Sequence, residues 1–96
     1  MSDYFVIEPC HTANGFEVKL KERTINLKKA EKAVDKVGMA MASSPVVMLA
    51  KVEDYSVSIY ASGRILIKSH KKITEKDATY VAEKLVSSLE KEGALQ

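Results

Sequence analysis

Several residue types that would indicate a particular function are scarce in this chain. Its 96 residues include no tryptophan, two prolines, one cysteine and four glycines that stand far apart. The single cysteine, Cys10, excludes an internal disulfide framework and favours a reducing compartment. The separated glycines exclude a glycine-rich phosphate loop. No apolar run is long enough for a transmembrane helix or a secretory leader, so we expect a cytoplasmic protein with no membrane partner.

The composition is that of an ordinary globular domain. Hydrophobic residues make up 46% of the chain and charged residues 29%, which places it outside the disordered class. The formal net charge of +2 is small for a chain built mainly to coat nucleic acid. We therefore expect residues 1–96 to form a single domain with its own hydrophobic core.

The residues that could carry catalysis or bind a metal do not form a recognisable set. Cys10, His11 and His70 could supply three metal ligands, but the chain lacks the closely spaced ligand pair that zinc sites commonly use. Adjacent residues such as Cys10 and His11 rarely present both side chains in reacting geometry. The acidic residues fall at expected helix-surface, turn and cap positions: Asp35, Glu53, Asp54 and Asp77. We expect neither an enzyme nor a metal or cofactor site.

Two short runs near the N-terminus are predicted strands. Tyr4–Glu8 is β-prone and stops at Pro9, and an Asn-Gly turn signal follows. The run from Phe16 to Lys21 alternates strictly between apolar and polar residues, which predicts one buried and one wet face. The buried set is Phe16, Val18 and Leu20, and the wet set is Glu17, Lys19 and Lys21.

Two amphipathic helices are predicted. Asn26 is the expected N-cap of the first helix. Gly38 weakens the last part of this helix, so the helix could end near that residue. Its apolar stripe reaches Met41, so the helix could also persist to Ser43. The second helix is expected to begin with the capping-box-like sequence Thr74–Asp77.

The firmest local assignment is a β-hairpin over Tyr55–Lys68. Gly63 suits the left-handed third position of a three-residue loop, residues 61–63. This loop places the aliphatic side chains of both strands on one face, whereas a two-residue loop would mix the faces. The expected cross-strand pairs are Tyr60 with Arg64, Ile59 with Ile65, and Val57 with Ile67.

The other face of the hairpin is predicted to stay open. Both helices are needed to cover the aliphatic face, and no further element is left for the second. We therefore expect an α+β fold with a curved antiparallel sheet of four to five strands and two helices packed on one face. The candidate binding residues lie on the open face: Tyr60, Arg64, Leu66, Lys68, Lys19 and Lys21.

The hairpin and second helix resemble one repeat of the TATA-box-binding-protein family. Residues Val57–Lys68 supply an alternating strand, a Ser-Gly-Arg turn and an aliphatic strand, and Thr74–Leu89 supply the helix. Residues 16–52 stand in the order that this fold requires, and a similar pattern occurs in the C-terminal tail of ThiF/MoeB-like adenylyltransferases. That DNA-binding family forms a saddle from two repeats and inserts phenylalanines into the minor groove. This chain has room for one repeat and only Phe5 and Phe16, so TATA recognition is not expected.

An uninterrupted apolar run favours a role in assembly. Residues Val46–Val52 do not alternate, which predicts a strand that is covered on both sides or meets a partner. If Val46, Met48 and Leu66 are exposed, they form an apolar patch that invites a partner. We therefore expect a small non-catalytic binding or assembly module that acts by protein–protein interaction or homodimerisation.

The alternative is a nucleic-acid-binding protein that uses a basic open face. Lysines and arginines gather in residues 19–36 and again in residues 64–72. Tyr60 beside Arg64 could stack a base. The same charges also fit solvated faces and protected sheet edges, so both functions stay open.

Overall fold

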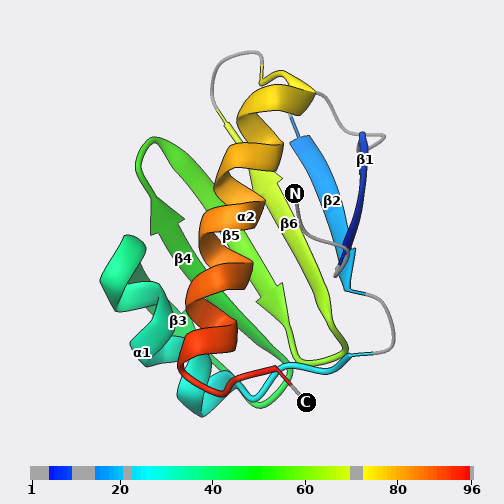
Figure 1. The fold of residues 1–96 in the computed structure, drawn as a ribbon. Coiled ribbons are helices and arrows are strands. Elements are labelled where there is room, and N and C mark those ends of the chain that lie inside the picture. Colours follow the sequence, from blue (N-terminus) through cyan, green and yellow to red (C-terminus); the bar gives the residue numbers. More distant parts are fainter. Residues whose placement is uncertain (1–4, 10–14, 21–22, 70–72, 96) are drawn as a thin grey trace.

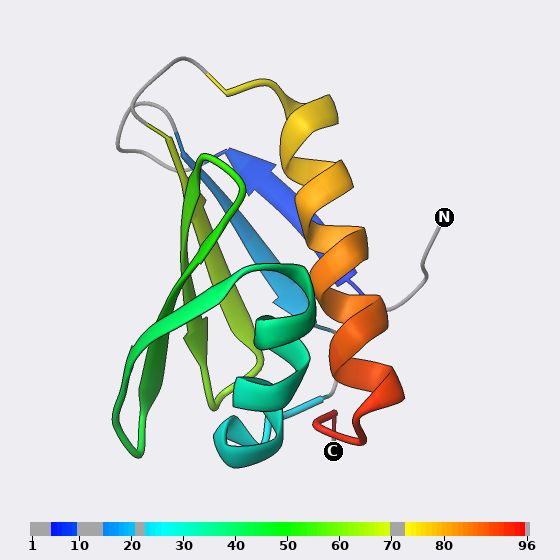
Figure 2. The ribbon, with the colours of Figure 1, turned by 90° about the vertical axis from the view of Figure 1, so that its left-hand side faces the viewer.

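The computed structural model describes residues 5–9, 15–20, 23–69 and 73–95. The elements, in chain order, are β1 (Phe5–Pro9), β2 (Gly15–Leu20), α1 (Leu27–Val37), β3 (Met39–Ser43), β4 (Val47–Val52), β5 (Tyr55–Tyr60), β6 (Arg64–Lys68) and α2 (Glu75–Lys91). The strands form one six-stranded antiparallel sheet in the order β1-β2-β6-β5-β4-β3, and both helices lie on the same side of it (Figures 1 and 2). The predicted α+β class is confirmed, with six strands in place of four to five.

The additional strand is β3, which occupies the residues into which the first helix could have continued. Helix α1 ends at Val37, and Gly38 is its C-cap, with an extended backbone at φ −171°. A Cβ atom on Gly38 would collide with the carbonyl oxygen of Lys51 in β4, so the glycine permits this close approach of the chain to β4. Of the two predicted ends of this helix, the one near Gly38 is therefore confirmed. The alternative, in which the helix continues through Met41 to Ser43, is wrong because these residues lie in β3.

The predicted helix starts are both confirmed. The side-chain oxygen of Asn26 accepts hydrogen bonds from the backbone N–H groups of Lys28 and Lys29, at 3.0 and 3.2 Å. At α2 the Thr74 hydroxyl accepts from the Asp77 N–H at 3.2 Å, and the Asp77 carboxylate accepts from the Thr74 N–H at 3.4 Å. These bonds satisfy backbone donors that the first turn of each helix leaves unpaired.

The hairpin has the predicted register. Tyr60 pairs with Arg64, Ile59 with Ile65, and Val57 with Ile67. Gly63 has the positive φ that the three-residue loop requires, at 99°. The three-residue loop and its register are therefore confirmed.

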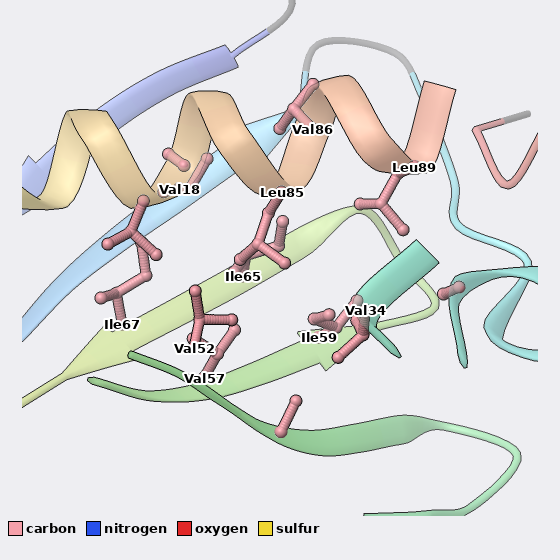
Figure 3. Close-up of a cluster of buried hydrophobic side chains, with 14 of the residues drawn as sticks. Val18, Val34, Val52, Val57, Ile59, Ile65, Ile67, Leu85, Val86 and Leu89 are labelled. Atoms are coloured by element: carbon pink, nitrogen blue, oxygen red, sulfur yellow. The ribbon is translucent and has the colours of Figure 1, made fainter. Parts of the chain in front are cut away.

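The core lies between the sheet and the two helices. Ile59, Ile65 and Ile67 project from the hairpin into a cluster that α2 completes with Leu85 and Leu89 (Figure 3). All five of these side chains are at most 1% exposed. Because one sheet face and both helices supply this cluster, neither described helix covers the opposite sheet face (Figure 2).

A buried serine joins the two helices. The Ser88 hydroxyl of α2 donates a hydrogen bond to the backbone carbonyl of Ala33 in α1, at 2.8 Å. Replacing Ser88 with alanine is expected to lower the free energy of unfolding by about 1 kcal/mol, because it removes one net hydrogen bond. Urea unfolding measures this loss, and Ser87→Ala is the matched control because Ser87 is exposed on the same helix. Equal losses in the two variants would contradict the prediction.

The segment before α1 is held by residues that follow α2. Ile25 forms a β-bridge with Leu95, and the Asn26 N–H donates to the carbonyl of the buried Ala94 at 2.7 Å. Glu92, which follows α2, also pairs with Lys36 in the last turn of α1, and this contact lowers the pKa of the Glu92 carboxyl. The corner of the molecule at the start of α1 is thus closed by the C-terminal residues.

Candidate functional site

The candidate site is the sheet face that neither helix covers, which we call the open face. Strand alternation and the ladder registers place its side chains. They are Glu8, Glu17, Lys19, Met39, Ala42, Val47, Leu49, Lys51, Ser56, Ser58, Tyr60, Arg64, Leu66 and Lys68. Five of the six predicted site residues lie here, and the sixth, Lys21, falls outside the described residues.

Tyr60 and Arg64 lie side by side, as the register requires. The Arg64 guanidinium carbon is 5.1 Å from the centroid of the Tyr60 ring. The Arg64 Nε also lies 2.9 Å from a carboxylate oxygen of Glu17 on the neighbouring strand. The sequence placed Glu17 on the wet face but did not indicate this ion pair, which depends on the register between β2 and β6. Arg64 is therefore held against both a ring and a carboxylate.

Lys19 is also paired with an acidic residue. Its ammonium lies 3.7 Å from a carboxylate oxygen of Glu8 on the edge strand β1. Both side chains are about half exposed, so this pair contributes little to stability. Its effect is to balance the charge at this end of the open face, together with the pair between Arg64 and Glu17.

A second row of the open face holds two lysines without such partners. Lys68, Ser56, Lys51 and Met39 follow one another across β6, β5, β4 and β3. Within the described ranges neither the Lys51 nor the Lys68 side chain makes a hydrogen bond or an ion pair. Among the described residues of the open face, Lys51 and Lys68 therefore carry the positive charges that no carboxylate pairs with.

Apolar side chains gather where β3 and β4 form the open face. Leu49 is 47% exposed, Val47 and Leu66 are half-buried, and Met39 is 65% exposed. Leu66, Ser58, Leu49 and Ala42 follow one another in one row across four strands. We call this set the apolar patch: Met39, Ala42, Val47, Leu49 and Leu66.

The patch differs from the predicted one in a central residue. The patch hypothesis required Met48 to be exposed, but Met48 is fully buried because it pairs with Ile59 and faces the helices. Its neighbours Val47 and Leu49 point to the open face instead. Val46 is exposed, as the hypothesis required, but it lies in the turn before β4. The run 46–52 is apolar on both faces, so only its pairing with β5 reveals which side chains are buried.

Two hollows lie on the helix side, where residues of α1 and β3 line both of them. The larger has a volume of about 580 Å³ and is lined by residues that include Leu27, Lys28, Glu31, Ser43 and Pro45. The smaller, of about 250 Å³, is lined by Glu31 and residues 40–43. Because Glu31 and Ser43 line both hollows, the two lie next to each other along β3.

No group of three or more histidine, cysteine, aspartate or glutamate side chains in the described part of the chain could hold a metal ion. The residues considered for such a site, Cys10, His11 and His70, lie outside it. None of the described helices is long and apolar enough to span a membrane.

Comparisons of this chain with protein-family models, with curated proteins and with solved structures find no match.

Proposed function

We propose that the protein is a small non-catalytic binding or assembly module that acts through its open face, by contact with a protein partner or a second copy. The observation that carries the proposal is the apolar patch on an uncovered sheet face, with Leu49 47% exposed near its centre. Contiguous apolar patches on soluble proteins commonly mark interaction sites. The single cysteine fits a reducing compartment, so we place this module in the cytoplasm.

The surroundings of the patch resemble the rim of an interface. The ion pairs of Arg64 with Glu17 and of Lys19 with Glu8 lie on one side of it. Lys51 lies beside Met39 in the neighbouring row. An apolar centre with a polar, solvent-accessible rim is the usual anatomy of a protein–protein interface. A protein partner with an apolar centre of its own would match this surface.

Nucleic-acid binding is the second candidate, and one observation favours it. Lys51 and Lys68 flank Ser56 in one row and have no acidic partners among the described residues, so they are available to phosphate oxygens. Arg64 and Lys19, in contrast, already face carboxylates. The protein partner is therefore the first proposal. The likeness to a TATA-box-binding-protein repeat stays a prediction about the fold family.

Leu49→Lys is expected to reduce partner binding by about tenfold or more, because a buried interface centre tolerates a charge poorly. Leu49 is exposed in the free protein, so its substitution is expected to change stability by about 0.5 kcal/mol or less. Affinity-tagged wild-type and variant proteins are compared by co-purification from the native host, with protein and nucleic acid both scored. The captured partner is then titrated against each variant.

The matched control is the double variant Lys51→Ala/Lys68→Ala, which changes the basic row and leaves the apolar patch in place. A protein partner is expected to resist nuclease treatment, to be lost with Leu49→Lys and to remain with the double variant. Salt-sensitive nucleic acid that is lost only with the double variant would favour the second candidate. A bound protein that is unaffected by Leu49→Lys would contradict the first.

A further inference from the structure

The free edge of β3 is a second uncovered feature of the molecule. β3 is the last of the described strands in the sheet, so none of them lies beside one side of its backbone. The Ser44 N–H donates to the Val47 carbonyl at 2.9 Å in the β3–β4 turn. Antiparallel ladders alternate bonded and non-bonded pairs, so the backbone N–H and C=O of the preceding Ser43 point toward the free edge. The strand therefore offers backbone hydrogen-bonding groups to solvent.

The two edges of the sheet differ in how they are protected. β1 carries Glu8, which is paired with Lys19, and Pro9, which has no backbone N–H. Charges and prolines of this kind hinder pairing at sheet edges. β3 has the sequence Met-Ala-Met-Ala-Ser, with no charge and no proline, and its Met39 and Met41 are 65% and 67% exposed. A β-bulge between Ala40 and Ala42 is the one protective feature of this strand.

We propose that β3 pairs with β3 of a second copy of this chain, antiparallel and about a two-fold axis. Such a pairing is self-complementary, because each strand presents the same backbone groups to the other. An axis through the middle of the strand, at Met41, sets Ala40 against Ala42 of the second copy, so no charge meets a like charge. Pairing of β3 with β1 of another copy would bring in Glu8 and Pro9, so the assembly closes as a dimer.

The predicted dimer is weak and leaves the open face free. The strand has five residues and the bulge interrupts its regular ladder, so the interface is expected to bury about 1,200 Å² or less, the range of transient complexes. Pairing at the edge joins the open faces of the two copies without covering either one. The inference therefore holds independently of what binds the open face.

Sedimentation and amide hydrogen exchange, measured from micromolar to near-millimolar protein, test the inference. For the wild type we expect a concentration-dependent monomer–dimer equilibrium, with slower exchange at Ser43 and its β3 neighbours and unchanged exchange in β1. Met41→Lys is expected to weaken dimerisation by about tenfold or more, because it sets two lysines against each other at the axis. Tyr80→Lys, at a 55% exposed position of helix α2, is the control and is expected to dimerise like the wild type.

Three results would overturn the inference: a monomer at every concentration, association that Met41→Lys does not weaken, or a dimer whose chemical-shift changes map to the open face and not to β3. Circular dichroism verifies that both variants are folded, as expected from the exposure of Met41 and Tyr80. The proposed function fails separately, when Leu49→Lys leaves partner binding unchanged.

Discussion

Replacing Gly63 with alanine is expected to lower the free energy of unfolding by about 2–4 kcal/mol. One cost arises because Gly63 has φ at 99°, a backbone conformation that strains any residue with a Cβ. The second arises because this Cβ would collide with the backbone carbonyl oxygen of Arg23. The loop cannot easily move away, since the Leu20 N–H donates to the Gly63 carbonyl and the Ile25 N–H donates to the Ala61 carbonyl, both at 2.9 Å.

Two other glycines separate these costs. Gly93 has φ at 72° but open space where a Cβ would lie, so Gly93→Ala is expected to lose only about 1–2 kcal/mol from backbone strain. Gly38 has an extended backbone but approaches the Lys51 carbonyl, so Gly38→Ala carries the steric cost alone. Urea unfolding of the three variants compares the losses. Equal losses for Gly63→Ala and Gly93→Ala would show that the close approach at Gly63 is unimportant.

Ile59→Ala is expected to destabilise the protein by about 2–5 kcal/mol. Ile59 is fully buried beside Ile65, its ladder partner on β6 (Figure 3). Its partner on β4, Met48, is also fully buried. Truncation removes apolar contact at the middle of the sheet and leaves a cavity that the paired strands cannot readily fill. A loss of this size is a large fraction of the stability of a small domain.

The matched control for this core substitution is Val46→Ala. Val46 is also aliphatic but 65% exposed, so its truncation is expected to change the free energy of unfolding by about 0.5 kcal/mol or less. Thermal and urea unfolding measure both variants. Similar losses at Ile59 and Val46 would contradict the assignment of the core to the helix side of the sheet.

The parts of the fold that the sequence predicts correctly are set by local interactions. The hairpin register follows from the alternation of its strands and from Gly63, and the helix starts follow from Asn26 and Thr74. The same register places Tyr60 and Arg64 together on the open face, so most of the candidate site could be located from the sequence.

The parts that sequence reasoning missed depend on contacts between distant residues. Residues 39–43 have the spacing of a helical stripe, and only the approach of Gly38 to Lys51 shows that a new strand begins there. The burial of Met48 in place of its neighbours follows from pairing with β5, since the run is apolar on both faces. The ion pair of Glu17 with Arg64 likewise requires the register of β2 against β6.

The closure of the α1 corner by Ala94 and Leu95 has a consequence for biosynthesis. Both residues leave the ribosome long after Ile25 and Asn26, the residues that they bind. The sheet places β2 beside β6 in the same way, so its pairing also waits for later residues. Contacts this distant in sequence form late and slow the search for the native state. We therefore expect the nascent chain to remain incompletely folded until residue 95 has cleared the exit tunnel, exposed meanwhile to chaperones and proteases.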